Sequence, residues 1–333
     1  MYKNFICVFT YAHIIYGYNM SIRDELLNKY LIILETKDLV ELLPQRHIIC
    51  KTFNKREIDD KTISIVMTTH NRPEQTLFTL KTIANSSYKN VHVVIVDDYK
   101  WILLYDMELE GFGIYIDYVR ISDKFWINPC INYNIGFKFV KGNRIIIQNG
   151  EVCHIGDVIS YVDKNLSDGK YLSFDVLNLA DRGKNFILYT RKSTSYDDNF
   201  TMRHYKGHWP WYQHYETANN NLHFLTAITK KDLDKAGWFD HDFCLGMCWD
   251  DNAFIYKIKL AGINIVPVNN EIEKVMGIHQ WHKQTEAGPS YSINNDILYE
   301  NKSYYHQTNG VYIDLTEDNI PKHIVDRIKK LMD

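Results

Sequence analysis

The chain has 333 residues, 45% of them hydrophobic and 24% charged, which is the composition of a soluble globular protein large enough to bury a full α/β core. Its net charge of −3 argues against a general nucleic-acid-binding protein. The six cysteines lack the spacing of a zinc ribbon or a redox pair, so we expect reduced thiols and a cytoplasmic location.

The first part of the chain is predicted to be a helical extension over residues 1–60. An apolar run at 5–18 is too short and too polar to span a membrane, so membrane association is not expected. Apolar positions over 21–43 predict one or two helices, and Pro44 ends them. Residues 51–61 are rich in Lys, Arg and Asp without periodicity, which indicates a solvated linker.

A strand, a helix and a second strand then follow in quick succession. β-Branched and apolar residues predict strands at 62–69 and 91–96, with a helix over 73–84 between them. Such a βαβ unit must be parallel and right-handed. The second strand ends in Asp97 and Asp98, and the polar carboxyl end of this unit is where a nucleotide would bind.

A further acid, Glu151, follows another predicted core strand. Ile145, Ile146 and Ile147 predict a strand buried on both faces, and Asn149-Gly150 ends it directly before Glu151. A carboxylate at the carboxyl end of a core strand is a candidate metal ligand. The alternative is a loop acid that faces water.

The rest of the chain continues the α/β pattern. Further strands are predicted at 114–119, 171–176, 223–229 and 263–268, and further helices after 128–136 as far as Lys141-Gly142, at 156–165, 230–237, 252–261 and 322–332.

Residues 64–72 followed by 94–98 resemble the opening of the inverting family 2 glycosyltransferases. The resemblance implies a GT-A fold: a Rossmann-like α/β domain over 61–285 with a mixed, mostly parallel central sheet flanked by helices, followed by a C-terminal tail over 286–333. It further implies that Thr68 and Asp98 contact the base of a nucleotide sugar, for which a UDP-sugar is the first choice.

Other positions of the nucleotide site follow from the same resemblance. Asn134 matches an Asn on the family's helix before the metal strand, although helix capping explains Asn132 or Asn134 equally well. The full set expected to contact the nucleotide sugar is Thr68, Thr69, His70, Asn71, Arg72, Asp97, Asp98, Asn134, Gln148 and Asn149.

The resemblance also implies a divalent cation, Mn²⁺ or Mg²⁺. Where most members of the family have Asp-x-Asp, this chain has Asn149-Gly150-Glu151, which keeps one anion and one neutral oxygen donor. His282 stands where several relatives have a His that completes the metal site, and His279 is the alternate.

Two downstream segments are candidates for the acceptor side. Aromatic rings at 209–214 suit a sugar, whose C–H faces stack on rings, although an ordered surface flap is an equal alternative. By resemblance Asp251 matches the catalytic base, with Asp250 as the base if the register differs by one; adjacent acids at a helix N-terminus are also favoured by the helix dipole. The residues expected to bind the acceptor are Trp209, Trp211, Tyr212, His214 and Trp249.

These features together predict an inverting glycosyltransferase that acts on a glycan, glycoprotein or lipid-linked acceptor. One alternative is a non-catalytic sugar- or nucleotide-binding protein that retains the fold. A nucleotidyltransferase is disfavoured, because a Gly-rich basic loop is missing after the first strand, where residues 69–73 stand instead.

Overall fold

The computed structural model describes residues 48–121, 126, 128–179, 181–191, 193–196, 211–245, 247–283 and 299. The predicted N-terminal helices, the C-terminal tail apart from Tyr299, and Trp209 lie outside the described residues. Among the described residues, no helix has the length and apolar character needed to cross a membrane.

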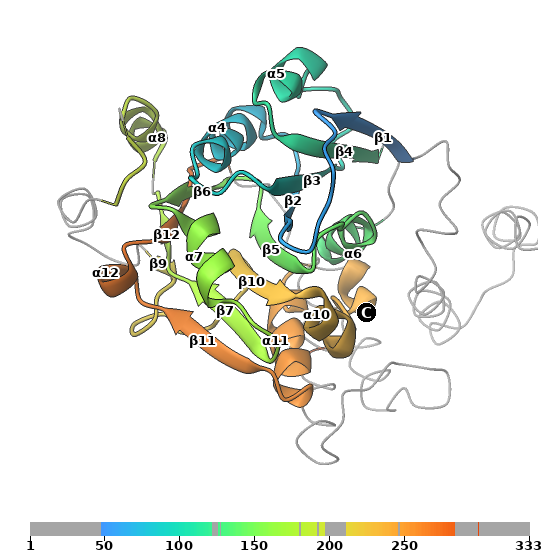
Figure 1. Ribbon diagram of the computed structural model, residues 1–333, viewed down its shortest axis with the longest axis vertical. Helices are drawn as coiled ribbons and strands as arrows, with labels where there is room; N and C mark the ends of the chain where they lie inside the picture. The colour runs from blue at the N-terminus through green and yellow to red at the C-terminus, as the bar shows by residue number, and fades with distance from the viewer. Residues whose placement is uncertain are drawn as a thin grey trace, which may run out of the picture. The chain divides into compact units, whose positions relative to one another are not determined.

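An eight-stranded sheet runs through the molecule in the order β1-β4-β3-β2-β5-β10-β7-β11 (Figure 1). Its strands are β1 (Ile48–Phe53), β2 (Ile63–Thr69), β3 (Val91–Asp97), β4 (Tyr115–Ile121), β5 (Arg144–Asn149), β7 (Lys170–Phe174), β10 (Leu225–Thr229) and β11 (Asn264–Val268). Strands β4, β3, β2 and β5 are parallel neighbours, as are β7 and β11. Strand β1 pairs antiparallel with β4, and β10 pairs antiparallel with both β5 and β7. The predicted mixed, mostly parallel α/β sheet is therefore confirmed.

Helices cover both faces of this sheet. On one face, α4 (Pro73–Ala84) and α7 (Val158–Asn165) bury Leu80 and Val162 in the same apolar cluster as Ile65 of β2. On the other face lies α6 (Cys130–Lys138), which approaches β2 so closely that a Cβ on Gly136 would stand 2.5 Å from Val66 Cγ1. Both packings fix the ends of β2 and β5 relative to α4 and α6.

A smaller sheet stands beside the carboxyl ends of the parallel strands. Its order is β6-β12-β8-β9, formed by β6 (Val152–Ile155), β12 (Met276–His279), β8 (Val176–Asn178) and β9 (Trp211–Gln213). Because β6 leaves β5 after a single turn and pairs with β12, residues that follow β12 come to lie beside Glu151.

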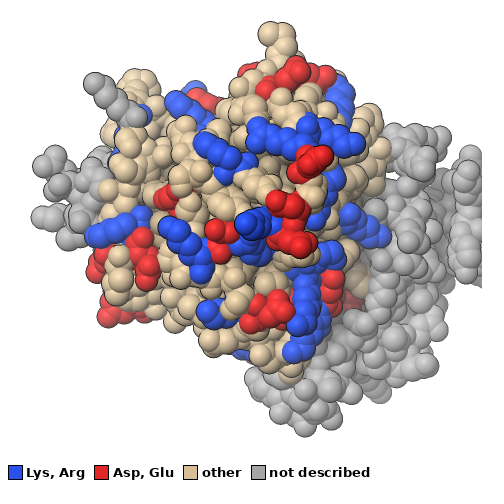
Figure 2. Space-filling model, in the orientation of Figure 1, with Lys and Arg blue, Asp and Glu red and all other residues tan. Residues whose placement is uncertain are grey.

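The remaining helices lie around the two sheets (Figure 1). They are α5 (Asp106–Gly111), α8 (Arg182–Tyr189), α10 (Lys230–Ala236), the 3-10 helix η4 (His241–Leu245), α11 (Asp250–Leu260) and α12 (Asn270–Glu273). The predicted Gly stop of α10 is confirmed, since Gly237 adopts φ +83° at its C-cap. On the face drawn in Figure 2, Lys and Arg side chains are interspersed with Asp and Glu.

Two predictions of local structure are wrong. The expected linker at 51–61 begins as strand β1, whose only neighbouring strand among the described residues is β4, so its exposed positions accept polar residues without the alternation that marks a strand. Helix α6 ends at Lys138, not at Lys141-Gly142. The backbone N–H groups of Lys141 and Gly142 donate instead to Ser64 Oγ, which ties this turn to β2.

Candidate functional site

The candidate site lies at the carboxyl ends of β2, β3 and β5. Thr68 pairs with Asn149 and Thr69 with Asp97, so the residues after the three strands meet at one edge of the sheet. Glu151 follows β5 and is only 2% exposed. The alternative of a loop acid that faces water is therefore wrong.

Three side chains meet at Glu151 in a group that could hold a cation. The Nε2 atoms of His279 and His282 lie 3.2 Å and 3.7 Å from Glu151 Oε1. One ligand atom from each of the three residues falls within 4.8 Å of the others. Both imidazole nitrogens face Oε1, which is therefore the carboxylate oxygen that a cation shared by the three residues would contact, whereas Oε2 is buried without a hydrogen-bond partner among the described residues.

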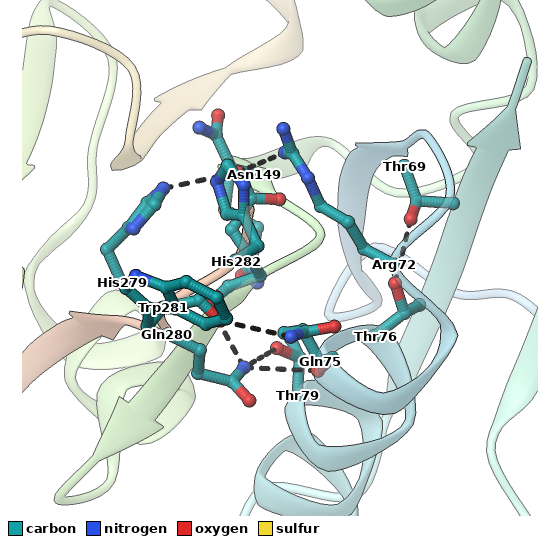
Figure 3. Close-up of polar contacts among 12 residues, drawn as sticks. Thr69, Arg72, Gln75, Thr76, Thr79, Asn149, His279, Gln280, Trp281 and His282 are labelled. Carbon is teal, nitrogen blue, oxygen red and sulfur yellow. Dashed lines mark hydrogen bonds and ion pairs between the residues drawn. The ribbon is translucent and has the colours of Figure 1, made fainter. Parts of the chain in front are cut away.

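The donor set fits a divalent cation. One carboxylate and two imidazoles are ligands that transition metals accept readily, whereas Mg²⁺ prefers oxygen donors alone. This chemistry favours Mn²⁺ over Mg²⁺. Figure 3 shows the side chains of His279 and Arg72 approaching the region of Asn149 and His282 from opposite sides.

Electrostatics keep Glu151 and His282 in their ligating forms. Burial by itself would raise the pKa of Glu151, but the charge of Arg72 and the hydrogen bond from His279 outweigh it and lower that pKa. Burial and the charge of Arg72 lower the pKa of His282. At neutral pH Glu151 is therefore ionised and His282 is neutral, as metal ligation requires.

Gln280 holds the end of β12 against α4 and Glu151. Its Nε2 donates to the backbone oxygens of Gln75 and Glu151 and contacts Thr79 Oγ1, at 3.1, 3.0 and 3.0 Å (Figure 3). In return, Gln75 Nε2 donates to the backbone oxygen of Trp281 at 3.0 Å. These bonds fix the two histidines relative to the carboxylate.

Asp97 at the end of β3 and Asp98 directly after it have different partners. Asp97 is buried, and its carboxylate accepts from the Tyr118 hydroxyl at 2.6 Å and from the Tyr99 backbone N–H at 3.0 Å. Asp98 instead contacts His70 Nδ1 at 2.6 Å and accepts from Asn132 Nδ2 at 2.6 Å. Asp97 therefore anchors the loop, whereas Asp98 lies beside the segment that follows β2.

Several other expected nucleotide contacts have internal partners. The fully buried Gln148 bonds to the Val152 backbone oxygen and to His154 through its amide, so we do not expect it to touch a ligand. Both amide atoms of Asn134 bond to the backbone of Phe239. The Oγ1 atoms of Thr69 and Thr76 are 2.8 Å apart. Thr68 is half-buried, and Asn71 is exposed at φ +56°.

The second acid pair begins helix α11. Asp250 is 4% exposed; its Oδ1 accepts from Asn128 Nδ2 at 2.9 Å, and its Oδ2 has no partner among the described residues. Burial and the adjacent charge of Asp251 raise the pKa of Asp250 to about 7. Asp251 is half-buried and accepts from the Asn252 backbone N–H at 2.8 Å; burial raises its pKa as well.

The charges of Asp250 and Glu151 both affect the pKa of Tyr133. Burial raises the pKa of the Tyr133 hydroxyl, and the charges of Glu151 and Asp250 raise it further. The start of α6 joins the two sides, because Asn128 contacts Asp250 and Asn132 contacts Asp98. The acid at the start of α11 thus belongs to the same edge of the sheet as the group around Glu151.

The aromatic residues expected on the acceptor side fall into two groups. Tyr212 packs edge-on against His279 at 4.6 Å and stacks on Phe224 at 4.8 Å, which places it beside the group that could hold a cation. On the same strand and the turn after it, the Trp211 and His214 rings are 4.6 Å apart. Trp249 stacks on Tyr299 at 4.3 Å, directly before the acid pair.

No family model and no curated protein matches this chain. Its fold is similar to that of mannosyltransferase PcManGT from Pyrobaculum calidifontis in complex with GDP-Man and Mn²⁺, with 12% identity, 93% of this chain and 81% of that chain covered, and a TM-score of 0.45. It is also similar to TarS from S. aureus, with 14% identity, 79% and 50% covered, and a TM-score of 0.47. For TarS 1-349 in complex with UDP-GlcNAc the identity is 15%, the coverage 68% and 61%, and the TM-score 0.46.

These likenesses do not by themselves assign an activity, since every TM-score is below 0.5. The chain also spans only 50% of the longer TarS chain. The function proposed below rests on the chain's own residues.

Sequence reasoning missed Tyr133, Asn128 and Gln280. Each acts through a partner that is distant in the chain, such as Asp250 for Asn128 and Glu151 for Gln280. A weak signal existed for Gln280, which stands between the two candidate histidines. A single buried Gln or Tyr otherwise carries no pattern in a sequence.

Proposed function

We propose that this protein is an inverting glycosyltransferase of family 2 with a GT-A domain, and that it uses a nucleoside-diphosphate sugar, with a UDP-sugar as the first choice. The observation that carries the proposal is the convergence of Glu151, His279 and His282 at the sheet edge where Asp98 also lies. A cation ligand group beside a nucleotide-side acid is an arrangement that suits a diphosphate donor.

The donor would bind across the ends of β2, β3 and β5. Asp98, held by His70 and Asn132, would accept a hydrogen bond from the base, with Thr68 beside it. A divalent cation on Glu151, His279 and His282 would supply Lewis-acid assistance to the leaving diphosphate.

The general base is an acid at the start of α11. It would take the proton from the acceptor hydroxyl as that oxygen attacks the anomeric carbon opposite the departing diphosphate. Such catalysis contributes roughly 10²–10⁴-fold. The resemblance implies Asp251, but the buried Oδ2 of Asp250, which has no partner among the described residues, favours Asp250.

We further propose that the GT-A domain begins at β1 instead of residue 61, because Ile48–Phe53 pairs with β4 over its whole length. The boundary at 285, the helical extension before the domain, the tail after it and the cytoplasmic location stay predictions.

A panel of nucleotide sugars tests the proposal by thermal shift with and without Mn²⁺, since a ligand that binds the folded state raises the melting temperature. The stabilising donor is then incubated with candidate glycan acceptors, and NMR of the product reports the anomeric configuration. We expect Mn²⁺-dependent stabilisation and an inverted product. Binding without any transfer would favour the non-catalytic alternative.

A further inference from the structure

Arg72 occupies the same oxygen that the cation would use. Its Nη1 lies 2.5 Å from Glu151 Oε1, the atom that also faces His279 and His282. The guanidinium comes from the N-cap position of α4, and its side chain is 24% exposed, whereas the Glu151 side chain is 2% exposed. A fixed positive charge therefore sits inside the candidate metal group.

The guanidinium and a divalent cation cannot both keep this position. A cation on Oε1 would stand about 2 Å from that atom, which brings two like charges to within a few ångströms in a largely buried site. Without the cation, however, removal of the guanidinium would leave a buried carboxylate whose remaining charged or ionisable partners among the described residues are two imidazoles, which is costly. Arg72 thus supplies the positive charge that Glu151 needs when no metal is bound.

We propose that Arg72 competes with the divalent cation for Glu151 Oε1, holding the carboxylate in the metal-free protein and leaving it when the metal binds. This inference rests on the metal site of the proposed function but not on the transfer reaction. It implies that the site binds its cation more weakly than its three ligands alone would allow.

The test measures the affinity of the full chain for Mn²⁺ in the absence of nucleotide and acceptor. Calorimetry or the EPR signal of free Mn²⁺ reports the binding. Arg72→Gln should bind Mn²⁺ about tenfold more tightly or better, because the competing charge is gone. The matched control is Lys81→Gln, which removes a positive charge from the last turn of the same helix, far from Glu151, and should bind Mn²⁺ like the wild type.

Thermal unfolding gives a second readout. In EDTA, Arg72→Gln should melt at a lower temperature than the wild type, and Mn²⁺ should raise its melting temperature by more than it raises that of the wild type. If Arg72→Gln does not fold, Arg72→Lys decides, since its shorter ammonium should compete less well and give a smaller gain in affinity.

An Mn²⁺ affinity that is unchanged or weaker in Arg72→Gln would overturn the competition, because Arg72 would then merely orient the carboxylate. So would the failure of both proteins to bind Mn²⁺. If Arg72 and Mn²⁺ compete but the protein binds no nucleotide, this inference is supported and the proposed function is contradicted.

Discussion

The hydroxyl of Tyr133 lies 2.8 Å from Oδ1 of Asn149 and 3.0 Å from the backbone oxygen of Gln148. Tyr133 is fully buried, and the raised pKa of its hydroxyl keeps it protonated and able to donate. Asn149 can therefore be held in place without adding a second negative charge beside Glu151. This contact gives a physical account of the amide that stands where the resemblance leads one to expect an acid.

Tyr133→Phe should lower the free energy of unfolding by about 1 kcal/mol or more, because it removes the hydroxyl donor that the Asn149 amide oxygen and the Gln148 backbone oxygen share at the end of β5. Chemical denaturation measures the change. Tyr161→Phe, which alters a half-buried tyrosine of α7 away from this edge, is the control. Equal effects of the two substitutions would show that the Tyr133 hydroxyl has no special role.

Asp98→Ala should weaken binding of UDP by about tenfold or more, the effect expected from loss of a charge-assisted hydrogen bond. The fold should persist, since Asp98 follows β3 and lies outside the apolar core. Titration calorimetry measures the affinity, with Asp106→Ala on the surface of α5 as the control. An unchanged affinity would remove Asp98 from the site.

The long apolar runs of β2, β3 and β5 made the part of the site at the ends of these strands predictable. Strands β2, β3 and β5 are almost wholly buried, so their sequences are unbroken and their ends, with Asp98 and Glu151, could be located in advance. The smaller sheet was not predicted, because strands of three or four residues are too short to show a period.

The contacts between the candidate residues could not be predicted from the sequence, for a different reason. His279 and His282 were expected to join Glu151, but Arg72 was expected to contact the nucleotide, and nothing in the chain places it on the same carboxylate. That contact depends on how the start of α4 faces the turn after β5, which only the packing of the two elements decides.

Glu151→Ala and His282→Ala should each lower the affinity for Mn²⁺ by about tenfold or more, since the loss of a residue that merely supports a ligand already costs roughly that much, and should remove metal-stimulated hydrolysis of the donor. Calorimetry and a nucleotide-release assay measure the two effects. His241→Ala probes the second group of potential ligands, Asp240, His241 and Asp242, and should leave the affinity unchanged. Full activity in EDTA would contradict the metal-assisted part of the proposal.

Asp250→Asn should stabilise the protein more at pH 8 than at pH 5. Burial and the charge of Asp251 raise the pKa of Asp250 from 3.8 to about 7 in the folded state, so the folded protein binds a proton that the unfolded chain releases. The stability from this group is complete below about pH 4 and is lost as the pH rises to about 7. An uncharged amide avoids that loss. Thermal unfolding at the two pH values checks the sign, and a larger gain at pH 5 would contradict it.

Asp250→Asn should also cut transfer by about two or more orders of magnitude while donor and Mn²⁺ binding persist, because a general base acts only on a bound acceptor. Asp251→Asn is the neighbouring control and should have a smaller effect. Wild-type transfer should fall as the pH drops below about 7, since a protonated Asp250 cannot accept the acceptor's proton. If the two substitutions exchange their effects, Asp251 is the base, as the resemblance implies. If neither affects transfer in an active protein, the pair serves only the helix N-terminus, and the segment from Trp211 to His214 becomes the next candidate for the acceptor side.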